Sequence, residues 1–157
     1  MKFGKVMVAA IVLGSGASGA LADSYTVERS LDLEADSTEV WRVIGDFCDV
    51  DDWHPDVSSC SLKVTDGRLH RVLRTVGGDE FVERRIASEA GLSYTYRLVS
   101  GPLPVENYTA TLSIEPGETT TVTWSARFKS EDAGMEQAVG GLFDKGLAAI
   151  EARFAAE

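Results

Sequence analysis

The fold is decided by residues 41–108, which read WRVIGDFCDVDDWHPDVSSCSLKVTDGRLHRVLRTVGGDEFVERRIASEAGLSYTYRLVSGPLPVENY. This stretch opens with a short apolar helical pattern and then alternates between apolar and polar residues, as half-buried strands do. Glycine-containing turns separate the alternating segments and predict β-hairpins. Aromatic and polar residues recur at intervals that a curved sheet needs to line a pocket. The most prominent groups are Trp53-His54-Pro55, Glu83-Arg84-Arg85 and the segment 101–108.

The flanking residues complete the pattern. Alternation over residues 25–33 predicts a first strand, and Asp36 offers a capping side chain to a short apolar helix that includes residues 40–44. A second short helical turn is predicted at residues 48–53, and from residue 131 the apolar period becomes helical again. The order predicts an α+β fold in which a long C-terminal helix lies across a seven-stranded antiparallel sheet. The six further strands are predicted at residues 57–64, 68–76, 80–88, 92–100, 105–114 and 119–129.

A signal peptide is predicted over residues 1–22. Lys2 and Lys5 flank an apolar run at residues 6–13, and Ala20-Leu21-Ala22 has the small-x-small form of a signal-peptidase site. The apolar run is too short to be a membrane anchor, because crossing a hydrocarbon core takes about 20 residues. We therefore expect cleavage after Ala22 and a single exported domain at residues 23–157, periplasmic, or secreted where there is no outer membrane.

The charge of the chain excludes some partners. The formal net charge is −10 at pH 7, and the predicted leader carries two lysines and no acids, so cleavage would take the charge to −12. Such an acidic chain repels the phosphates of nucleic acids and of anionic lipids. We expect no nucleic-acid partner and no stable membrane insertion, whereas a protein partner is left open and unidentified.

The two cysteines are Cys48 and Cys60. An exported protein meets oxidising conditions, in which these residues could close a small loop, but a free cysteine also serves as a small buried apolar residue. Separation in sequence does not fix the distance between the Cα atoms, so the sequence leaves the pairing open. No Cys or His spacing matches a zinc or haem site, and we predict neither a metal nor a cofactor.

Several of these segments resemble a known family. Residues 40–47, Trp53-His54-Pro55 and Cys60 are similar to the first two helices and second strand of the START-like, birch-pollen-allergen-like (SRPBCC) superfamily, specifically its bacterial polyketide cyclase/dehydrase branch. The resemblance covers residues 25–154. It implies the helix-grip fold, a curved sheet wrapped on the long C-terminal helix with two short helices between the first two strands.

Plant abscisic-acid receptors, distant members of the superfamily, offer a comparison for the pocket. Glu83 and Tyr108 fall on pocket-lining positions of those receptors, and His54 falls where they have the lysine that meets the carboxylate of the ligand. The gate loop of the receptors is reduced to Gly77-Gly78-Asp79. The resemblance therefore implies a pocket without hormone-type gating.

The predicted ligand-binding residues are those that face inward if the sheet curls as in this family. On the strand at residues 80–88, the two-residue period places Phe81, Glu83 and Arg85 on one face, which the resemblance makes concave. Glu83 and Arg85 should then pair with one another or with a ligand, and a half-exposed pair at the rim is the alternative. The full set is Trp53, His54, Val72, Phe81, Glu83, Arg85, Tyr96, Leu98, Leu103, Tyr108, Trp124, Leu142 and Gly146.

Two interpretations stay open within this set. His54 and Glu83 are the candidate catalytic groups, but a single imidazole next to Pro55 could equally cap the short helix or bond to the sheet. Gly146, with two more glycines in the predicted C-terminal helix, indicates either space left for a ligand or close packing. We recognise no motif for a nucleophile–base pair in the sequence.

The function predicted from these features is binding of a hydrophobic or amphipathic small molecule. A binding protein needs only an apolar cavity with a few polar groups, whereas the alternative, a cyclase/dehydrase-like enzyme, needs an acid/base pair that reaches the substrate. A third interpretation rests on resemblance to the exported accessory proteins of periplasmic methanol dehydrogenase, which are similar in leader, length and the Trp-His-Pro element. That interpretation implies an exposed protein-binding patch.

Overall fold

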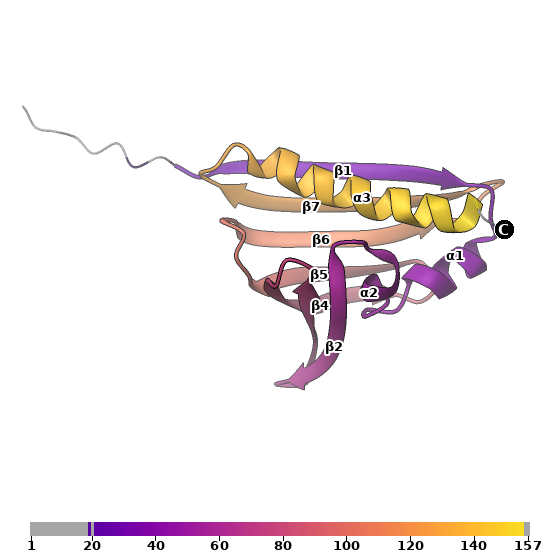
Figure 1. The fold of residues 1–157 in the computed structure, drawn as a ribbon, viewed down its shortest axis with the longest axis horizontal. Helices are drawn as coiled ribbons and strands as arrows, with labels where there is room; N and C mark the ends of the chain where they lie inside the picture. Colours follow the sequence, from indigo (N-terminus) through magenta and orange to yellow (C-terminus); the bar gives the residue numbers. More distant parts are fainter. Residues whose placement is uncertain (1–18, 20, 156–157) are drawn as a thin grey trace, which may run out of the picture.

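The computed structural model describes residue 19 and residues 21–155 (Figure 1). The predicted signal peptide at residues 1–22 therefore lies mostly outside the described residues. None of the helices in the described part of the chain is long and apolar enough to cross a membrane. The elements are β1 (Asp23–Leu33), α1 (Ser37–Ile44), α2 (Val50–Trp53), β2 (Val57–Thr65), β3 (Arg68–Thr75), β4 (Glu80–Glu89), β5 (Ser93–Ser100), β6 (Glu106–Glu115), β7 (Thr120–Ser130) and α3 (Met135–Ala155).

The strands form one antiparallel sheet in the order β1-β7-β6-β5-β4-β3-β2. Strands β2 to β7 follow one another through hairpins, and β1 pairs with β7 at the far edge. The β2–β3 hairpin turns at Asp66 and Gly67, whose positive φ angles of 52° and 68° are those of a tight two-residue turn. The predicted seven-stranded α+β architecture is confirmed.

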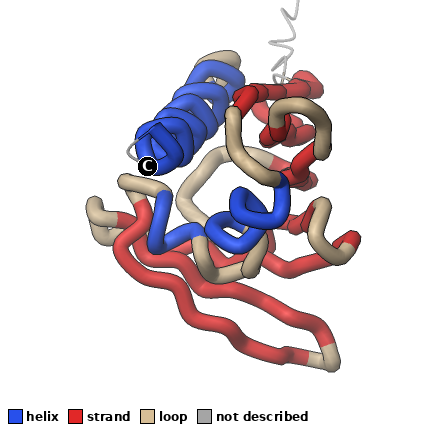
Figure 2. Tube along the Cα trace, turned by 90° about the vertical axis from the view of Figure 1, so that its right-hand side faces the viewer, coloured by secondary structure: helices blue, strands red, loops and turns tan. Residues whose placement is uncertain are grey.

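Helix α3 lies across the inner face of the sheet, while α1 and α2 cover its other part (Figures 1 and 2). Phe143 of α3 stacks on Trp124 of β7 with ring centroids 4.3 Å apart, and both side chains are buried. This contact belongs to a continuous core between helix and sheet. The helix-grip arrangement expected from the sequence is therefore present.

The connection from β1 to β2 is held at two points. Asp36 caps α1 by accepting a hydrogen bond from the Thr38 N–H at 2.8 Å, as the sequence predicts. Cys48 and Cys60 form a disulfide with Cα atoms 5.4 Å apart, within the ordinary range. The bridge joins the segment between α1 and α2 to β2 and answers the question that the sequence left open.

Gly146 shows why α3 can approach the sheet so closely. A Cβ atom at this position would lie 2.8 Å from His54 Cδ2 and 2.8 Å from Trp124 Cζ3. The close-packing interpretation is therefore correct for Gly146, which leaves no space for a ligand at this position. Gly141 differs, because a Cβ there would meet nothing within 4 Å.

Candidate functional site

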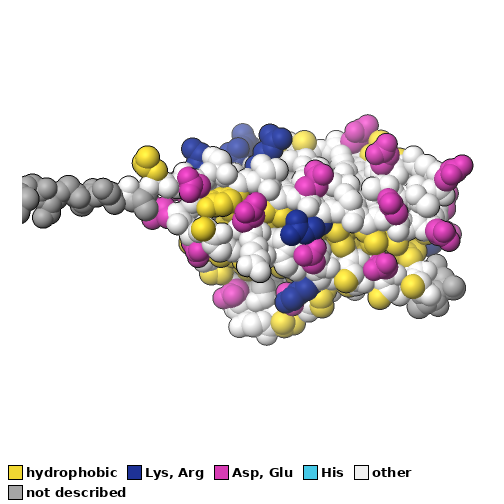
Figure 3. Space-filling view, turned by 90° about the horizontal axis from the view of Figure 1, so that it is seen from above, with side chains coloured by type: hydrophobic (Ala, Val, Ile, Leu, Met, Phe, Trp, Pro, Cys, Tyr) yellow, Lys and Arg dark blue, Asp and Glu magenta, His cyan; other side chains and the backbone are white. Residues whose placement is uncertain are grey.

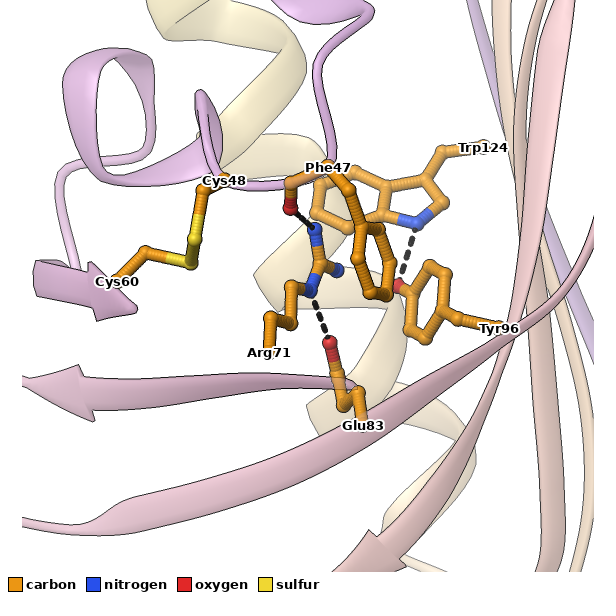
Figure 4. A network of polar contacts seen from close by, with 7 residues as sticks. All are labelled: Phe47, Cys48, Cys60, Arg71, Glu83, Tyr96 and Trp124. Carbon is orange, nitrogen blue, oxygen red and sulfur yellow. Dashed lines mark hydrogen bonds and ion pairs between the residues drawn. A yellow bond between two sulfur atoms is a disulfide. The ribbon is translucent and has the colours of Figure 1, made fainter. Parts of the chain in front are cut away.

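A buried ion pair forms the polar wall of the interior (Figure 4). Arg71 on β3 and Glu83 on β4 lie directly opposite one another in the strand register. The Arg71 Nε–H donates to Glu83 Oε2 at 2.6 Å, and its Nη1 donates to the Phe47 carbonyl oxygen at 2.6 Å. The side chain of Arg71 is 1% exposed and that of Glu83 10%. A paired charge of this kind is tolerated in an interior because each partner neutralises the other.

Aromatic rings surround the guanidinium. Its central carbon lies 4.3 Å from the Phe47 ring centroid and 4.6 Å from that of Tyr96, distances at which cations attract ring faces. Burial opposes the charge, but the Glu83 carboxylate and the neighbouring tyrosines outweigh it and hold the pKa of Arg71 above its ordinary value. Arg71 therefore remains a cation under all physiological conditions.

Two tyrosines extend the polar wall. Trp124 Nε1 donates a hydrogen bond to the Tyr96 hydroxyl at 3.0 Å (Figure 4). Burial raises the pKa of Tyr96 and of Tyr108, so both hydroxyls keep their protons at neutral pH. These groups can exchange hydrogen bonds with a ligand but cannot act as bases near neutrality.

A small cavity of about 60 Å³ lies beside this wall. Most of its surface is apolar, and the polar contribution comes from the ion pair, His54 and the tyrosines. It is lined by Val50, His54, Val57, Arg71, Leu73, Phe81, Glu83, Tyr96, Leu98, Leu103, Tyr108, Trp124 and Leu142.

A wider outer cleft of about 280 Å³ adjoins the cavity between the β3–β4 turn and the first turns of α3. Phe81, Leu103 and Leu142 line both spaces and so form a constriction between them. Phe81 closes against Gly101, where a Cβ atom would lie 2.7 Å from Phe81 Cδ1. The glycine therefore lets the phenyl ring occupy its closed position.

Nine of the thirteen residues predicted from the sequence line the cavity. Trp53 is buried behind it, with its ring edge-on to Trp124 at 5.5 Å. The nine are His54, Phe81, Glu83, Tyr96, Leu98, Leu103, Tyr108, Trp124 and Leu142.

Val72 and Arg85, also predicted to bind the ligand, do not line the cavity. Val72 lies between the inward-facing Arg71 and Leu73, so alternation along β3 turns it to the outer face. Arg85 is exposed next to a β-bulge, and the expected Glu83–Arg85 pair does not form because Glu83 pairs with Arg71. Arg71 was missed, although it shares the alternating phase of Leu73 on the same strand.

His54 is held on both ring nitrogens by the backbone. Its Nδ1 accepts from the Asp56 N–H at 3.1 Å, and its Nε2–H donates to the Leu142 carbonyl at 3.0 Å. This pattern requires the neutral imidazole, and burial lowers the pKa of His54. The structural interpretation of this residue is therefore favoured, with the ring joining the end of α2 to α3.

The site offers no metal-binding set. No group of three or more His, Cys, Asp or Glu side chains within the described ranges is arranged to hold a metal ion. The polar groups that line the cavity include the buried ion pair, the neutral imidazole and the phenol hydroxyls.

The sequence profile of the family described as "Polyketide cyclase / dehydrase and lipid transport" matches residues 24–155. The protein XoxI from Bacillus cereus is 30% identical, with a TM-score of 0.75, over 83% of this chain and 95% of that chain. No curated protein matches the sequence.

More distant solved structures share the fold. The Zhui aromatase/cyclase from Streptomyces sp. R1128 is 16% identical with a TM-score of 0.62, over 85% of this chain and 94% of that chain. Norcoclaurine synthase from Thalictrum flavum, in complex with dopamine and hydroxybenzaldehyde, is 14% identical with a TM-score of 0.65, over 99% and 98% of the two chains.

Proposed function

The chain belongs to the polyketide cyclase/dehydrase and lipid transport family, and from that premise we propose that it binds a small hydrophobic or amphipathic molecule without transforming it. The observation that carries the proposal is the largely apolar cavity with one polar wall, which three side chains separate from an outer cleft. Ligand sites combine these features, an apolar lining with a few oriented polar groups.

The size of the cavity says how binding must proceed. Ligand pockets commonly measure about 300–1,000 Å³, far above the 60 Å³ enclosed here. The outer cleft of 280 Å³ lies on the other side of Phe81, Leu103 and Leu142. Displacement of these three side chains would join the two spaces and bring them to the lower end of the common range. We propose that a ligand enters by this displacement.

The polar wall favours a ligand that donates hydrogen bonds. The guanidinium of Arg71 already donates hydrogen bonds to Glu83 and to the Phe47 carbonyl, and its charge is paired with Glu83, so it does not need an acidic ligand as a partner. A carboxylate ligand would place a second anion beside Glu83 in a medium of low dielectric constant. A neutral ligand with a hydroxyl or amine group meets no such penalty and can donate to Glu83 or Tyr108.

The enzyme alternative is less well supported. Protonation of Glu83 by a substrate would leave the Arg71 charge unpaired in the interior, where breaking such a pair costs about 3–5 kcal/mol. His54 would have to give up a backbone hydrogen bond before it could exchange a proton. Both predicted catalytic groups therefore already make interactions that stabilise the fold.

Export is part of the proposal. The predicted leader at residues 1–22 supports it, and so does the Cys48–Cys60 disulfide, since such bridges persist in oxidising compartments. We place the mature protein in the periplasm, or outside a cell that has no outer membrane.

A fluorescence titration with N-phenyl-1-naphthylamine, a neutral amphipathic probe with one N–H donor, tests the binding function. We expect saturable one-to-one binding, faster association with Phe81→Ala because the constriction is widened, and no change with Leu62→Ala on the exposed part of β2. Absence of saturable binding to both the parent and a folded Phe81→Ala protein would contradict the proposal. Equal acceleration by Leu62→Ala would show that the probe enters elsewhere.

A further inference from the structure

A row of six residues crosses six strands on the outer face of the sheet, and five of the six have basic side chains. Each member lies directly opposite the next in the strand register. The row, from β2 to β7, consists of Lys63, His70, Arg84, Arg97, Thr109 and Arg127. We refer to these six residues as the basic row.

The row faces solvent because its neighbours along each strand face the core. Arg71 and Glu83, which follow or precede His70 and Arg84, point inward, and side chains alternate along a strand. Within the row, Lys63, Arg97 and Arg127 are exposed, while His70 and Arg84 are half-buried. The basic groups are therefore presented on the surface, on the side away from the cavity.

Nothing within the described part of the chain neutralises the row. The ion pairs there join Arg29 to Asp144, Arg71 to Glu83, Arg74 to Glu80 and Lys145 to Asp56, and none includes a member of the row. Like charges directly opposite on neighbouring strands are destabilising, and this arrangement occurs between Arg84 and Arg97.

Arg84 is also left without a hydrogen bond at its Nε atom, which is buried. A buried donor without an acceptor costs stability. This cost adds to that of the like charges opposite one another at Arg84 and Arg97.

The row stands out against the composition of the chain. Acidic residues outnumber basic ones 25 to 15, yet no position of the row is acidic. Figure 3 shows a related asymmetry at the upper edge of the molecule, where Lys and Arg side chains gather at one end and acidic side chains occupy the other. A local positive surface on an acidic protein attracts an anionic partner in one orientation only.

We propose that the basic row binds an acidic polypeptide segment of a partner protein, independently of the ligand cavity. Neighbouring strands are about 4.8 Å apart, so the five steps from Lys63 to Arg127 extend over roughly 24 Å. An extended peptide covers that length with about seven residues, at about 3.3 Å per residue. Carboxylates on such a segment can meet each guanidinium in turn with paired hydrogen bonds.

Two further features select a peptide over a membrane. The sheet curls so strongly that β2 stands at a steep angle to β6 in Figure 1. A flexible chain can follow this convex surface, whereas a flat bilayer touches only part of it. A hollow of about 280 Å³ beside Arg127, lined by Thr109, Thr111, Ser125, Ala126 and Arg127, offers hydroxyl groups for the peptide backbone.

The test is fluorescence anisotropy with a labelled ten-residue peptide of alternating glutamate and serine, and with its glutamine counterpart as the neutral control. The variant Arg84→Gln/Arg97→Gln removes two charges from the row, and Arg42→Gln/Arg153→Gln removes two exposed charges from α1 and α3. We expect the parent to bind only the glutamate peptide, with affinity that falls as salt rises. The first variant should lose about tenfold in affinity and the second less than about twofold.

Two results would overturn the proposal. One is absence of glutamate-peptide binding to the parent at low salt, including the case in which polyphosphate or phosphatidylglycerol vesicles bind instead. The other is an equal loss in both double variants, which would show that net charge alone controls the interaction. Circular dichroism melts establish that both variants are folded.

Discussion

Arg71 and Glu83 meet across strands β3 and β4 with 2.6 Å between Nε and Oε2, and Arg71 is almost completely enclosed. The same guanidinium holds the carbonyl of Phe47, the residue before the disulfide at Cys48. One side chain thus joins the sheet, the α1–α2 connection and the wall of the cavity. Figure 4 shows the disulfide and the ion pair next to one another, where both meet this connection.

The ion pair gives the first prediction. Glu83→Gln leaves the buried Arg71 charge unpaired and should lower the free energy of unfolding by about 3–5 kcal/mol. The double variant Arg71→Met/Glu83→Leu removes both charges and should be much closer to the parent, because no unpaired charge remains. Urea denaturation of the parent, of Arg71→Met, of Glu83→Leu and of the double variant measures the coupling, and additive losses would contradict a direct pair.

The disulfide gives a second prediction. Cys48→Ser/Cys60→Ser should lower the free energy of unfolding by about 2–4 kcal/mol, since a loop with a sequence separation of 12 is no longer closed in the unfolded chain. Urea denaturation with and without dithiothreitol measures this change. The reductant should destabilise the parent and leave the double serine variant unaffected; a similar response in both would exclude the bridge as the cause.

The fold could be predicted because its signals are local. Seven alternating segments, turn residues such as Gly67 and the helical period after residue 131 each act within a few positions. Prediction of the site was harder, because its side chains interact with residues that are distant in the sequence. Alternation along β4 predicts correctly that Glu83 faces inward, but it offers Arg85 as the partner because both have the same phase on that strand.

The correct partner required the register between β3 and β4. Arg71 lies opposite Glu83 only because the β3–β4 turn sets that pairing, and a β-bulge near Arg85 marks where β4 leaves the regular ladder. Neither feature is visible in periodicity along one strand. The basic row was missed for the same reason, because its members are 7 to 18 positions apart in sequence and become neighbours only through the register.

A third prediction concerns the glycines of α3. Gly146→Ala should destabilise the protein by about 1–3 kcal/mol, because its Cβ would meet His54 and Trp124 at 2.8 Å in a packed interior. Gly141→Ala is the matched control, since its Cβ meets nothing and alanine favours a helix by about 1 kcal/mol. Thermal unfolding of both variants should show shifts of opposite sign; equal shifts would contradict the packing account.

A fourth prediction concerns export. If residues 1–22 form a cleaved leader, the mature chain starts at Asp23, which is also the first residue of β1. Amino-terminal sequencing of protein recovered from the exported fraction checks this start. A chain that retains Met1, or one found only in the cytoplasm, would contradict the proposal of export.

The final prediction separates a structural His54 from one that anchors a ligand. Burial lowers the pKa of His54 below its ordinary value of 6.5, so the unfolded chain takes up a proton at a higher pH than the folded protein does. The neutral, doubly bonded ring therefore contributes stability that is fully present above pH 6.5 and is lost as the pH falls below that value through the folded pKa. His54→Gln should remove this part of the pH dependence, whereas His70→Gln on the outer face should keep it.

Ligand binding supplies the second half of that test. A neutral probe held by apolar contacts and by Glu83 should bind with nearly constant affinity between about pH 7 and pH 5.5, as long as the protein stays folded. Titrations of N-phenyl-1-naphthylamine across this range, with the parent and with His54→Gln, measure this. If the affinity of the parent changes with histidine titration while the affinity of His54→Gln does not vary with pH, His54 takes part in ligand binding. A flat profile in both, with the pH-dependent stability confined to proteins that keep His54, would establish that the imidazole holds α2 against α3 and leaves recognition to the polar wall at Glu83 and Tyr108.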